Sequence, residues 1–571
     1  MHGFISIISL KKDILPIEFQ WKPLFEFQPV HIKRNFTSGN FQTEQFTSEK
    51  FLSDKLWINN EDFFIVTDGL ITNIDVLFKK HKVDDYESLI RIISTQDEDF
   101  FKQFTGNFVG FFYNKNNNYY TAFNNHTATK KLFYFSNEDY YIFSTDLYTL
   151  SKTLEKLEIK KTLDIEASYL LLTSGFMHDD YTLIKEVKQI RAGEYALFDQ
   201  KKLHLRFYFH LKDIQENTDN EKVIIEKLDI LFKEAIRSEF EFEKSRNYTP
   251  LTTLSGGLDS RMVALTAFDL NYRNQIMFNF SEKGYADEII ASEIAKSYHL
   301  PIFQVHLSPE SLLAIDDVVQ VNDGLNIYTG ISHVLEALKK ITDTQIGMIH
   351  TGMIGDAVLG SYLSSRQEVK SKISDGLFSN GLLNKAANII EKSISKYRNE
   401  ELYKFYNRAF LGINTGFLYF SLIAEASSPF LYPDFISYAH SIPKKFNYKE
   451  KIYIDWINKK HPEYASFTWE SIGGKPTNNK IIRFIYRLKR AIIKRLPIKS
   501  IWKNNMNPEQ LWYDENPKVK QYLDNYYSLN IADFITEPEL MNDMVQLYDK
   551  GNITEKTQVL TLLAAYKLLF R

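Results

Sequence analysis

The first 210 residues carry the short apolar runs of a strand-rich region. Runs of apolar and aromatic residues lie at 63–66, 108–113, 119–122, 132–135 and 140–144, and Gly, Asn or Asp turns stand beside the first three. Runs of this length and pattern predict β-strands, and helical periods near 85–93 and 165–172 interrupt them. We therefore predict an α+β domain over residues 1–211, built of paired strands with few helices.

The pattern changes after a polar stretch at 212–222. One predicted strand ends at 254, and others lie at 276–280, 302–307 and 346–350, alternating with predicted helices at 223–240, 259–268, 286–298 and 334–340. Strands that alternate with helices of this length indicate right-handed βαβ units and a parallel sheet. We predict an α/β domain over 223–475, followed by a C-terminal helical extension over 476–571.

Composition narrows the class of protein. A chain of 571 residues exceeds the ~250–300 residues of one hydrophobic core, and 44% hydrophobic with 25% charged residues excludes long disorder. The net charge of −3 argues against a nucleic-acid partner. No secretory signal follows Met1, and the longest uncharged run, about 16 residues before Glu425, is too short to span a membrane. We expect a cytoplasmic protein.

The strongest chemical signal is the sequence Leu-Ser-Gly-Gly-Leu-Asp-Ser-Arg at 254–261. A predicted strand leads into two glycines, which let a ligand approach the backbone, and a helix begins directly afterwards. The free amides at a helix start bind phosphate oxygens. Asp259 would repel a phosphate unless Mg²⁺ lies between them. The segment therefore predicts a magnesium–phosphate site, and it is not a P-loop because no Lys follows the glycines.

A second segment of similar form lies at 349–356, where Gly352, Gly355 and Asp356 follow the predicted strand 346–350. Ligands of open parallel sheets bind at the carboxyl ends of the strands. We therefore expect Asp259 and Asp356 to face one crevice, where two carboxylates suit a magnesium–pyrophosphate group.

These segments resemble the signature of the asparagine synthetase family, which includes asparagine synthetase B, the β-lactam synthetases and the lasso-peptide cyclases. The similarity spans most of the chain and includes Phe-Asn-Phe-Ser at 278–281, Ala-Asp-Glu at 286–288 and the segment 425–431. It implies a Rossmann-like ATP pyrophosphatase domain of the adenine nucleotide α-hydrolase-like type. In this family ATP is split to AMP and pyrophosphate while a carboxylate becomes an acyl-adenylate, and an amine then displaces AMP to leave an amide.

The resemblance also implies roles for individual residues. Asp259 and Asp356 fall on the family's magnesium ligands and act in catalysis. The positions that hold pyrophosphate are Ser255, Gly256, Gly257 and Ser260, and those that hold adenosine are Leu254, Phe280 and Gly352. Lys475, on a Gly-Gly loop, falls on the lysine that steadies the negative charge developing during the reaction.

The N-terminal region resembles the family's glutaminase domain, an Ntn-hydrolase-like α+β sandwich, at 68–73, 106–111 and 192–195. Such glutaminases use a Cys exposed by removal of the initiator Met as nucleophile. This chain has His2 at that position and contains no Cys at all. We predict that glutamine hydrolysis is lost and that the domain is a structural remnant.

The resemblance weakens where the acceptor binds. Met353 stands where asparagine synthetases have Glu and β-lactam synthetases have Tyr, and Met cannot take a proton. Ser427 and Tyr432 replace a family Arg and Asp, which argues against aspartate as substrate. Glu425 is either a base or a carboxylate satisfied within the core, and we favour the second interpretation.

The leading hypothesis is an ATP- and Mg²⁺-dependent ligase that forms C–N bonds. It joins a small-molecule or peptide carboxylate to an amine from a source other than glutamine: ammonia, an amino group of the same substrate, or a separate metabolite. Two alternatives remain open, asparagine synthesis itself and a catalytically silent scaffold. The intact segment 255–260 and Asp356 argue against silence.

Between 480 and 503 the chain has nine basic residues and no acidic one: Lys480, Arg483, Arg487, Lys489, Arg490, Lys494, Arg495, Lys499 and Lys503. Ile481, Ile485, Leu488 and Ile492 recur at helical spacing, which predicts a basic amphipathic helix. We expect it to pack on the synthetase domain with a solvated basic face. The other hypothesis is a docking site for an acidic partner or a membrane surface. The oligomeric state stays open, with a homodimer among the options.

Overall fold

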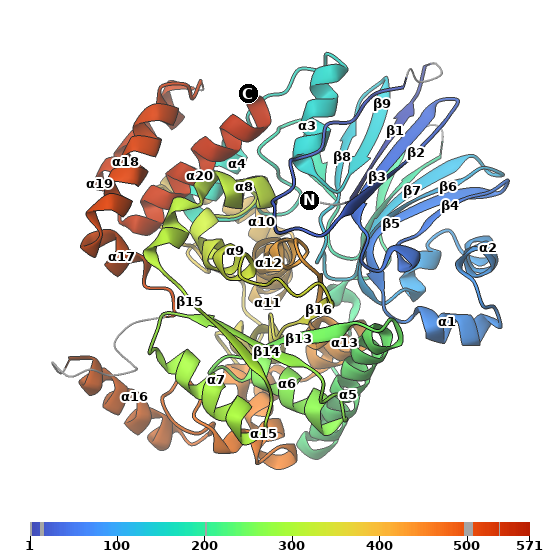
Figure 1. Cartoon of the computed structure of the whole chain (residues 1–571). Helices are drawn as coiled ribbons and strands as arrows, with labels where there is room; N and C mark the ends of the chain where they lie inside the picture. Colours follow the sequence, from blue (N-terminus) through green and yellow to red (C-terminus); the bar gives the residue numbers. More distant parts are fainter. Residues whose placement is uncertain (1–2, 12–15, 200–201, 496–505, 536) are drawn as a thin grey trace.

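The computed structural model describes residues 3–11, 16–199, 202–495, 506–535 and 537–571 (Figure 1). His2, Lys499 and Lys503, which figure in the sequence predictions, lie outside the described residues. No helix within these ranges combines the length and apolar character needed to cross a membrane.

The N-terminal part contains two antiparallel six-stranded sheets. The first has the order β10-β8-β9-β1-β3-β2, with β1 (Gly3–Ser9), β2 (His31–Ser38), β3 (Phe41–Ser48), β8 (Phe133–Ser136), β9 (Tyr140–Ser144) and β10 (Val187–Gln189). The second has the order β12-β11-β7-β6-β5-β4, with β4 (Trp57–Asn59), β5 (Phe63–Ile71), β6 (Gly106–Asn114), β7 (Tyr119–Asn124), β11 (Glu194–Phe198) and β12 (Leu203–Phe207).

Both faces of these sheets are buried over the central strands, because the sheets face each other and helices cover the outside, whereas the edge strands β2 and β12 are partly exposed. In β1, Phe4 and Ile8 join the core between the sheets, whereas Ile5 and Ile7 pack with the outer helices. The helices are α1 (Ile74–His81) and α2 (Tyr86–Gln96) on one side and α3 (Leu147–Lys156) and α4 (Ile165–Ser174) on the other. This arrangement confirms the predicted Ntn-hydrolase-like α+β sandwich.

The second part is built on a parallel five-stranded sheet, which confirms the predicted α/β fold. Its order is β15-β14-β13-β16-β17, with β13 (Thr249–Thr253), β14 (Ile276–Ser281), β15 (Ile302–His306), β16 (Ile346–His350) and β17 (Glu425–Ser427). The chain adds strands outward from β13 to β15 and then returns to add β16 on the other side. The order therefore reverses between β13 and β16, the position where doubly wound sheets bind ligands.

Helices cover both faces of this sheet. Figure 1 shows α5 (Glu221–Ser245), α6 (Asp259–Asp269) and α7 (Ala286–Ser297) on one face, with α9 (Ser332–Leu338) and α12 (Gly416–Phe420) on the other. The other helices up to residue 460 are α8 (Ile315–Asn322), α10 (Leu383–Ser395), α11 (Glu400–Lys404), α13 (Pro433–Ser441), α14 (Lys444–Asn447) and α15 (Lys451–Lys460). The edge strand β17 was not predicted, because three residues are too few to show a period of two.

The C-terminal helices are α16 (Lys480–Arg495), α17 (Glu509–Glu515), α18 (Pro517–Ile531), α19 (Pro538–Lys550) and α20 (Ile553–Phe570). The middle of helix α20, residues 557–565, is buried on all sides, as expected for a helix surrounded by protein. The Ser151 hydroxyl donates to the Leu569 carbonyl (2.6 Å), and Gln558 Nε2 donates to the Leu171 carbonyl (3.1 Å). Helix α20 therefore joins the end of the chain to the N-terminal sandwich.

A buried histidine fixes α5 to the sheet. His350, the last residue of β16, places Nδ1 3.2 Å from Glu239 Oε2 and Nε2 2.8 Å from Glu243 Oε2. Its ring stacks on Phe240 with the centroids 3.9 Å apart. Burial alone would disfavour the charged ring, but the two carboxylates outweigh it and raise the pKa of His350 to about 9.

This shift predicts how stability depends on pH. Because the folded-state pKa lies above the unfolded value of 6.5, the stabilisation is complete below pH 6.5 and is lost as the pH rises through 9. The total loss is about 3 kcal/mol at ~1.4 kcal/mol per pKa unit. Between pH 6.5 and 9, the thermal midpoint of the wild type should fall further than that of His350→Gln. Parallel pH profiles of the two proteins would contradict this explanation.

Candidate functional site

The two segments singled out in the sequence leave the sheet side by side. Strands β13 and β16 are adjacent and parallel, with Thr252 paired to His350 near their carboxyl ends. The glycine loop that follows β13 opens into α6 at Asp259, and the chain after β16 runs through Gly352 to Asp356. Both segments therefore lie at the point where the strand order reverses.

The structure brings Asp259 and Asp356 together. The backbone N–H of Asp356 donates to Asp259 Oδ2 (3.1 Å), and the Tyr453 hydroxyl of α15 donates to Asp259 Oδ1 (2.8 Å). Burial and the Asp356 carboxylate raise the pKa of Asp259 well above its usual range. A buried carboxylate beside a like charge is stabilised by a cation, and carboxylate oxygens are the ligands that Mg²⁺ prefers. The residues present therefore fit a magnesium ion.

A third carboxylate belongs to the same electrostatic group. Burial and Asp356 raise the pKa of Glu450 to about 7. Lys449 and Glu450 both have left-handed backbone, with φ of 59° and 61°. Such conformations are unfavourable for these residues and persist only where the surrounding structure holds them. Sequence reasoning missed Glu450 because it lies about 90 residues from Asp356 and belongs to no recognised segment.

Glycines allow the close approach of the two segments. A Cβ at Gly352 would lie 2.4 Å from the backbone nitrogen of Ser260, and one at Gly355 would lie 2.7 Å from Asp259 Cγ. Both distances are shorter than atoms tolerate. The turn after β16 can therefore touch the start of α6 only with glycine at these two positions.

The same turn has unusual backbone geometry. Ile354 has φ of 67°, an outlier for a β-branched residue. Directly after Asp356 the chain forms the short turn η6 (Ala357–Ser361), which is kinked at Leu359 and Gly360, and a π-helix, η7 (Phe405–Gly412), borders the same region. Strained residues and π-helical turns occur frequently at functional sites.

The glycine loop has an ordered hydrogen-bond pattern. Ser260 Oγ lies 2.9 Å from Ser255 Oγ and accepts from the Ser255 N–H (3.0 Å), while Ser255 Oγ accepts from the Gly257 N–H (3.1 Å). The Gly256 N–H donates instead to Asp287 Oδ1 (2.6 Å). The hydroxyls of Ser255 and Ser260 and the amides at the start of α6 lie together, as a site for phosphate oxygens requires.

A cavity of about 440 Å³ opens beside this loop. The predicted site residues that line it are Leu254, Ser255, Gly257, Asp259, Ser260, Phe280 and Gly352. His333 lines the cavity next to Phe280, with ring centroids 5.8 Å apart, and burial lowers the pKa of His333 to about 4. Among the predicted residues, Gly256, Asp356 and Lys475 are not part of the wall in the described structure.

Lys475 is exposed, but the loop before it is attached to the glycine loop. The Glu470 N–H donates to the Gly256 carbonyl (3.0 Å). The fully buried Arg261 guanidinium donates to the carbonyls of Gly256 (3.2 Å) and Thr468 (2.6 Å). The structure therefore brings the Lys475 loop to the site without placing the Lys475 side chain against the cavity.

The cavity wall is mainly apolar. Its apolar side chains include Phe176, Met353, Phe378, Ile413 and Phe420. Phe176 follows α4, so the N-terminal part of the chain contributes to the wall. The cavity also contains one guanidinium, Arg408 of η7, and no lysine among its described lining residues. Sequence reasoning did not identify Arg408, because the only feature that sets it apart in the sequence is its position before an uncharged run.

Glu425 is satisfied within the core, as favoured from the sequence. It lies 3.2 Å from Lys55 and 3.0 Å from Lys130, and Lys130 lies 3.3 Å from Asp68. Burial raises the pKa of Glu425, but the two lysines outweigh burial and lower it to about 2. An ionised and doubly paired carboxylate is a poor base, so Glu425 serves mainly to join the two parts of the chain.

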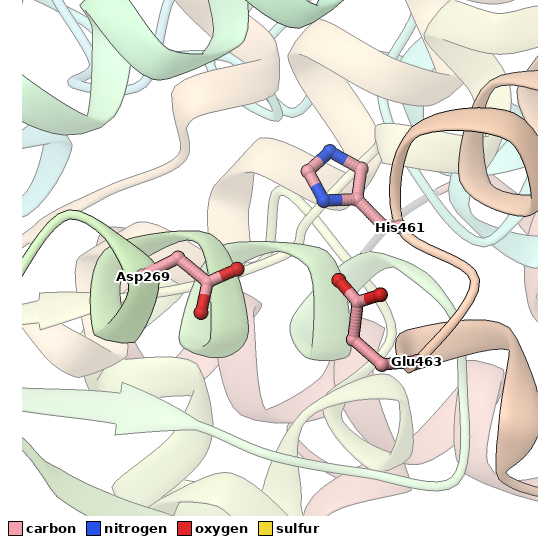
Figure 2. A group of neighbouring side chains, drawn as sticks. All are labelled: Asp269, His461 and Glu463. Carbon is pink, nitrogen blue, oxygen red and sulfur yellow. The ribbon is translucent and has the colours of Figure 1, made fainter.

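Asp269, His461 and Glu463 form a separate group (Figure 2), with one ligand atom of each lying within 4.8 Å of the others. Asp269 is the last residue of α6, so the group lies at the opposite end of that helix from Asp259. His461 Nε2 lies 2.7 Å from Asp229 Oδ1 of α5. The ring thus connects the end of α15 to α5, and two of the three members are exposed carboxylates. We interpret this group as structural.

Comparisons with known families place two matches on the chain. Residues 57–209 match the glutamine amidotransferase domain, and residues 245–409 match asparagine synthase. A protein of Methanocaldococcus jannaschii that bears the provisional name asparagine synthetase (glutamine-hydrolysing) 2 is 24% identical over 214 residues. The match covers 36% of this chain and spans only 40% of the length of that relative.

Two solved structures are also similar in part. One is the allosteric regulatory enzyme of purine biosynthesis, with 7% identity over 47% of this chain and 67% of the other. The second is the glutamine phosphoribosylpyrophosphate amidotransferase from B. subtilis, with 9% identity over 56% and 68%. Both have a TM-score of 0.21, which is too low to carry an argument.

The close contact at Gly352 predicts a sharp effect of one methyl group. Gly352→Ala should weaken ATP binding at least tenfold, because a misfit at a packed contact costs about 1–3 kcal/mol. Titration calorimetry measures this affinity. Gly330→Ala is the matched control, since Gly330 lines the same cavity but its Cβ would meet its nearest neighbour only at 3.4 Å. Equal ATP affinities of the two variants would contradict the packing argument.

Proposed function

Because the chain is a member of the asparagine synthetase family, we propose that it is an ATP-dependent ligase that forms an amide from a carboxylate and an amine. The observation that carries this proposal is the meeting of Asp259 and Asp356 beside the glycine loop and its cavity. Two carboxylates, free helix amides and a cavity suit a nucleotide triphosphate and a divalent cation.

In the proposed reaction, an oxygen of the substrate carboxylate attacks the α-phosphorus of ATP. A new P–O bond forms, the bond to the β-phosphate oxygen breaks, and pyrophosphate leaves. The amine then attacks the acyl carbon of the adenylate, the C–O bond to AMP breaks, and the nitrogen loses a proton. Met353 has no basic atom, so the proton leaves by another group.

The residues of the site have separate roles in this proposal. Ser255, Gly256, Gly257 and Ser260 hold the pyrophosphate, and Leu254, Phe280 and Gly352 hold the adenosine. Asp259 and Asp356 hold Mg²⁺, which when bound neutralises phosphate charge. Lys475 turns inward on its Gly-Gly loop to meet the negative charge that develops in the transition state.

We propose that the substrate combines an apolar body with an anionic group. The apolar side chains of the cavity wall bury the body, and the Arg408 guanidinium pairs with the anion. Arginine recognises carboxylates through two parallel hydrogen bonds, which fixes the orientation of the acid relative to the nucleotide. Arg408 would pair with aspartate as well, so the apolar walls are what favours an amphiphilic acid over a small polar one such as aspartate.

The N-terminal unit acts as a support in this proposal, without glutaminase activity. Its buried lysines serve the parallel sheet: Lys50 Nζ donates to the carbonyls of Ile346 (2.6 Å) and Ile423 (2.9 Å), and Lys55 pairs with Glu425. The absence of Cys from the sequence removes the nucleophile of this glutaminase type. We propose that residues 1–211 and 223–475 form the two domains and that residues 476–571 form a C-terminal extension.

Asparagine synthesis is the second candidate, favoured by the name of the M. jannaschii relative. The replacements at Ser427 and Tyr432 do not exclude aspartate from the cavity, because neither residue is part of its described wall. The Ser427 hydroxyl donates instead to Glu239 Oε2 of α5 (2.7 Å). A silent scaffold is the third candidate, and the retained carboxylate pair argues against it.

The decisive assay measures pyrophosphate release from ATP across a panel of carboxylic acids and short peptides, with the product identified by mass. Asp259→Asn and Asp356→Asn should lower turnover by about 10²–10³-fold, as loss of a charge-stabilising group does. Asp269→Asn, at the other end of α6, is the matched control and should retain activity. Glutamine should release no glutamate above background.

Each candidate function predicts a distinct outcome of this assay. Asparagine formed from aspartate and ammonium would favour the second candidate over an amphiphilic acid. No ATP binding at all would favour the scaffold. Glutamate release from glutamine would contradict the loss of the glutaminase.

The role of Arg408 predicts a selective kinetic effect. Arg408→Gln should raise KM for the acid at least tenfold while the KM for ATP stays unchanged, because the guanidinium serves only the acid. Arg408→Lys keeps the charge but loses the paired hydrogen bonds, so it should recover part of the affinity. Equal changes in the two KM values would argue against a contact with the acid.

A further inference from the structure

Helix α16 presents an apolar face to solvent. Its large apolar side chains are highly exposed: Ile481 71%, Phe484 65%, Ile485 54%, Leu488 49% and Ile492 51%. Their spacing of i, i+3, i+4, i+7 and i+11 places them on one side of the helix. Figure 1 shows α16 at the periphery of the molecule.

The opposite side of α16 is attached to the protein by polar and aromatic groups. The Arg483 guanidinium lies 5.4 Å from the ring centroid of Trp469. Arg490 pairs with Glu470 (2.8 Å) and donates to the carbonyls of Glu470 (2.8 Å) and Ser471 (3.1 Å). The ring of Tyr486 lies against Gly474.

This orientation is the reverse of an ordinary surface helix, which buries its apolar side and exposes its charges. The prediction that α16 packs on the domain and exposes basic residues holds for Lys480, Arg487 and Lys489, but the apolar side does not form the packed face. Arg483, Tyr486 and Arg490 contact the 469–474 loop in its place. A contiguous apolar face that is exposed to solvent indicates a surface that binds a partner.

The charges of α16 indicate the chemical nature of the partner that covers this face. The sequence between 480 and 503 contains no acidic residue, and the exposed side chains of Lys480, Arg487 and Lys489 border the apolar face. Two copies of α16 laid face to face would bring like charges together, which disfavours self-association. An anionic surface with an apolar interior satisfies both the cations and the apolar side chains.

We propose that α16 docks on an anionic lipid bilayer surface. The helix lies in the plane of the interface, with Phe484 and Leu488 among the acyl chains and the lysines and arginines at the headgroups. The contacts of α16 also extend to the glycine loop. The Glu470 carboxylate pairs with Arg490 of α16, and the Glu470 N–H donates to the Gly256 carbonyl. The proposal is independent of the chemistry proposed for the cavity.

Vesicle sedimentation with the full-length protein tests the proposal. The wild type should bind vesicles of phosphatidylcholine with phosphatidylglycerol at least tenfold more tightly than vesicles of phosphatidylcholine alone, with affinity falling as salt rises. The double variant Phe484→Ser with Leu488→Ser should lose at least tenfold in affinity for the anionic vesicles. Leu529→Ser is the matched control, since Leu529 is 74% exposed on α18, and its binding should be unchanged.

Three outcomes would overturn the proposal. The first is no binding of the wild type to anionic vesicles, and the second is equal binding by the double variant. The third is a dimer in light scattering that the double variant converts to a monomer, because a second copy would then be the occupant of the apolar face.

Discussion

The site depends on the placement of Asp259 and Asp356 at one edge of the sheet, where the Asp356 carboxylate helps to raise the pKa of Asp259. Adjacent parallel strands deliver them to one edge of the sheet, and glycines at 352 and 355 remove the atoms that would keep them apart. Tyr453 donates a hydrogen bond to Asp259, which offsets part of the cost. A bound cation would offset the remainder, as the proposed function requires.

The rest of the chain keeps this edge in place. His350 joins β16 to α5 through two glutamates, and Arg261 holds the 464–468 segment to the glycine loop. The N-terminal sandwich adds buried lysines at the edge of the sheet and Phe176 in the cavity wall. These contacts are the basis of the structural role proposed for the N-terminal domain.

The sequence predicts the parts of this molecule that rest on local pattern. The four long parallel strands and the adjacency of Asp259 and Asp356 follow from periodicity and from the geometry of parallel sheets. The strand β17, Arg408 and Glu450 do not follow, because three residues show no period and isolated charges show no spacing. The orientation of α16 departs from the expectation, since amphipathicity reveals the two faces of a helix but not which of them finds partners.

The most direct measurement of the central claim is the position of the metal. Crystals grown with ATP and Mn²⁺ in place of Mg²⁺ would reveal the ion by its anomalous scattering. We expect a peak within bonding distance of carboxylate oxygens from both Asp259 and Asp356 and of the phosphates. A metal bound to the nucleotide but remote from either carboxylate would contradict the claim.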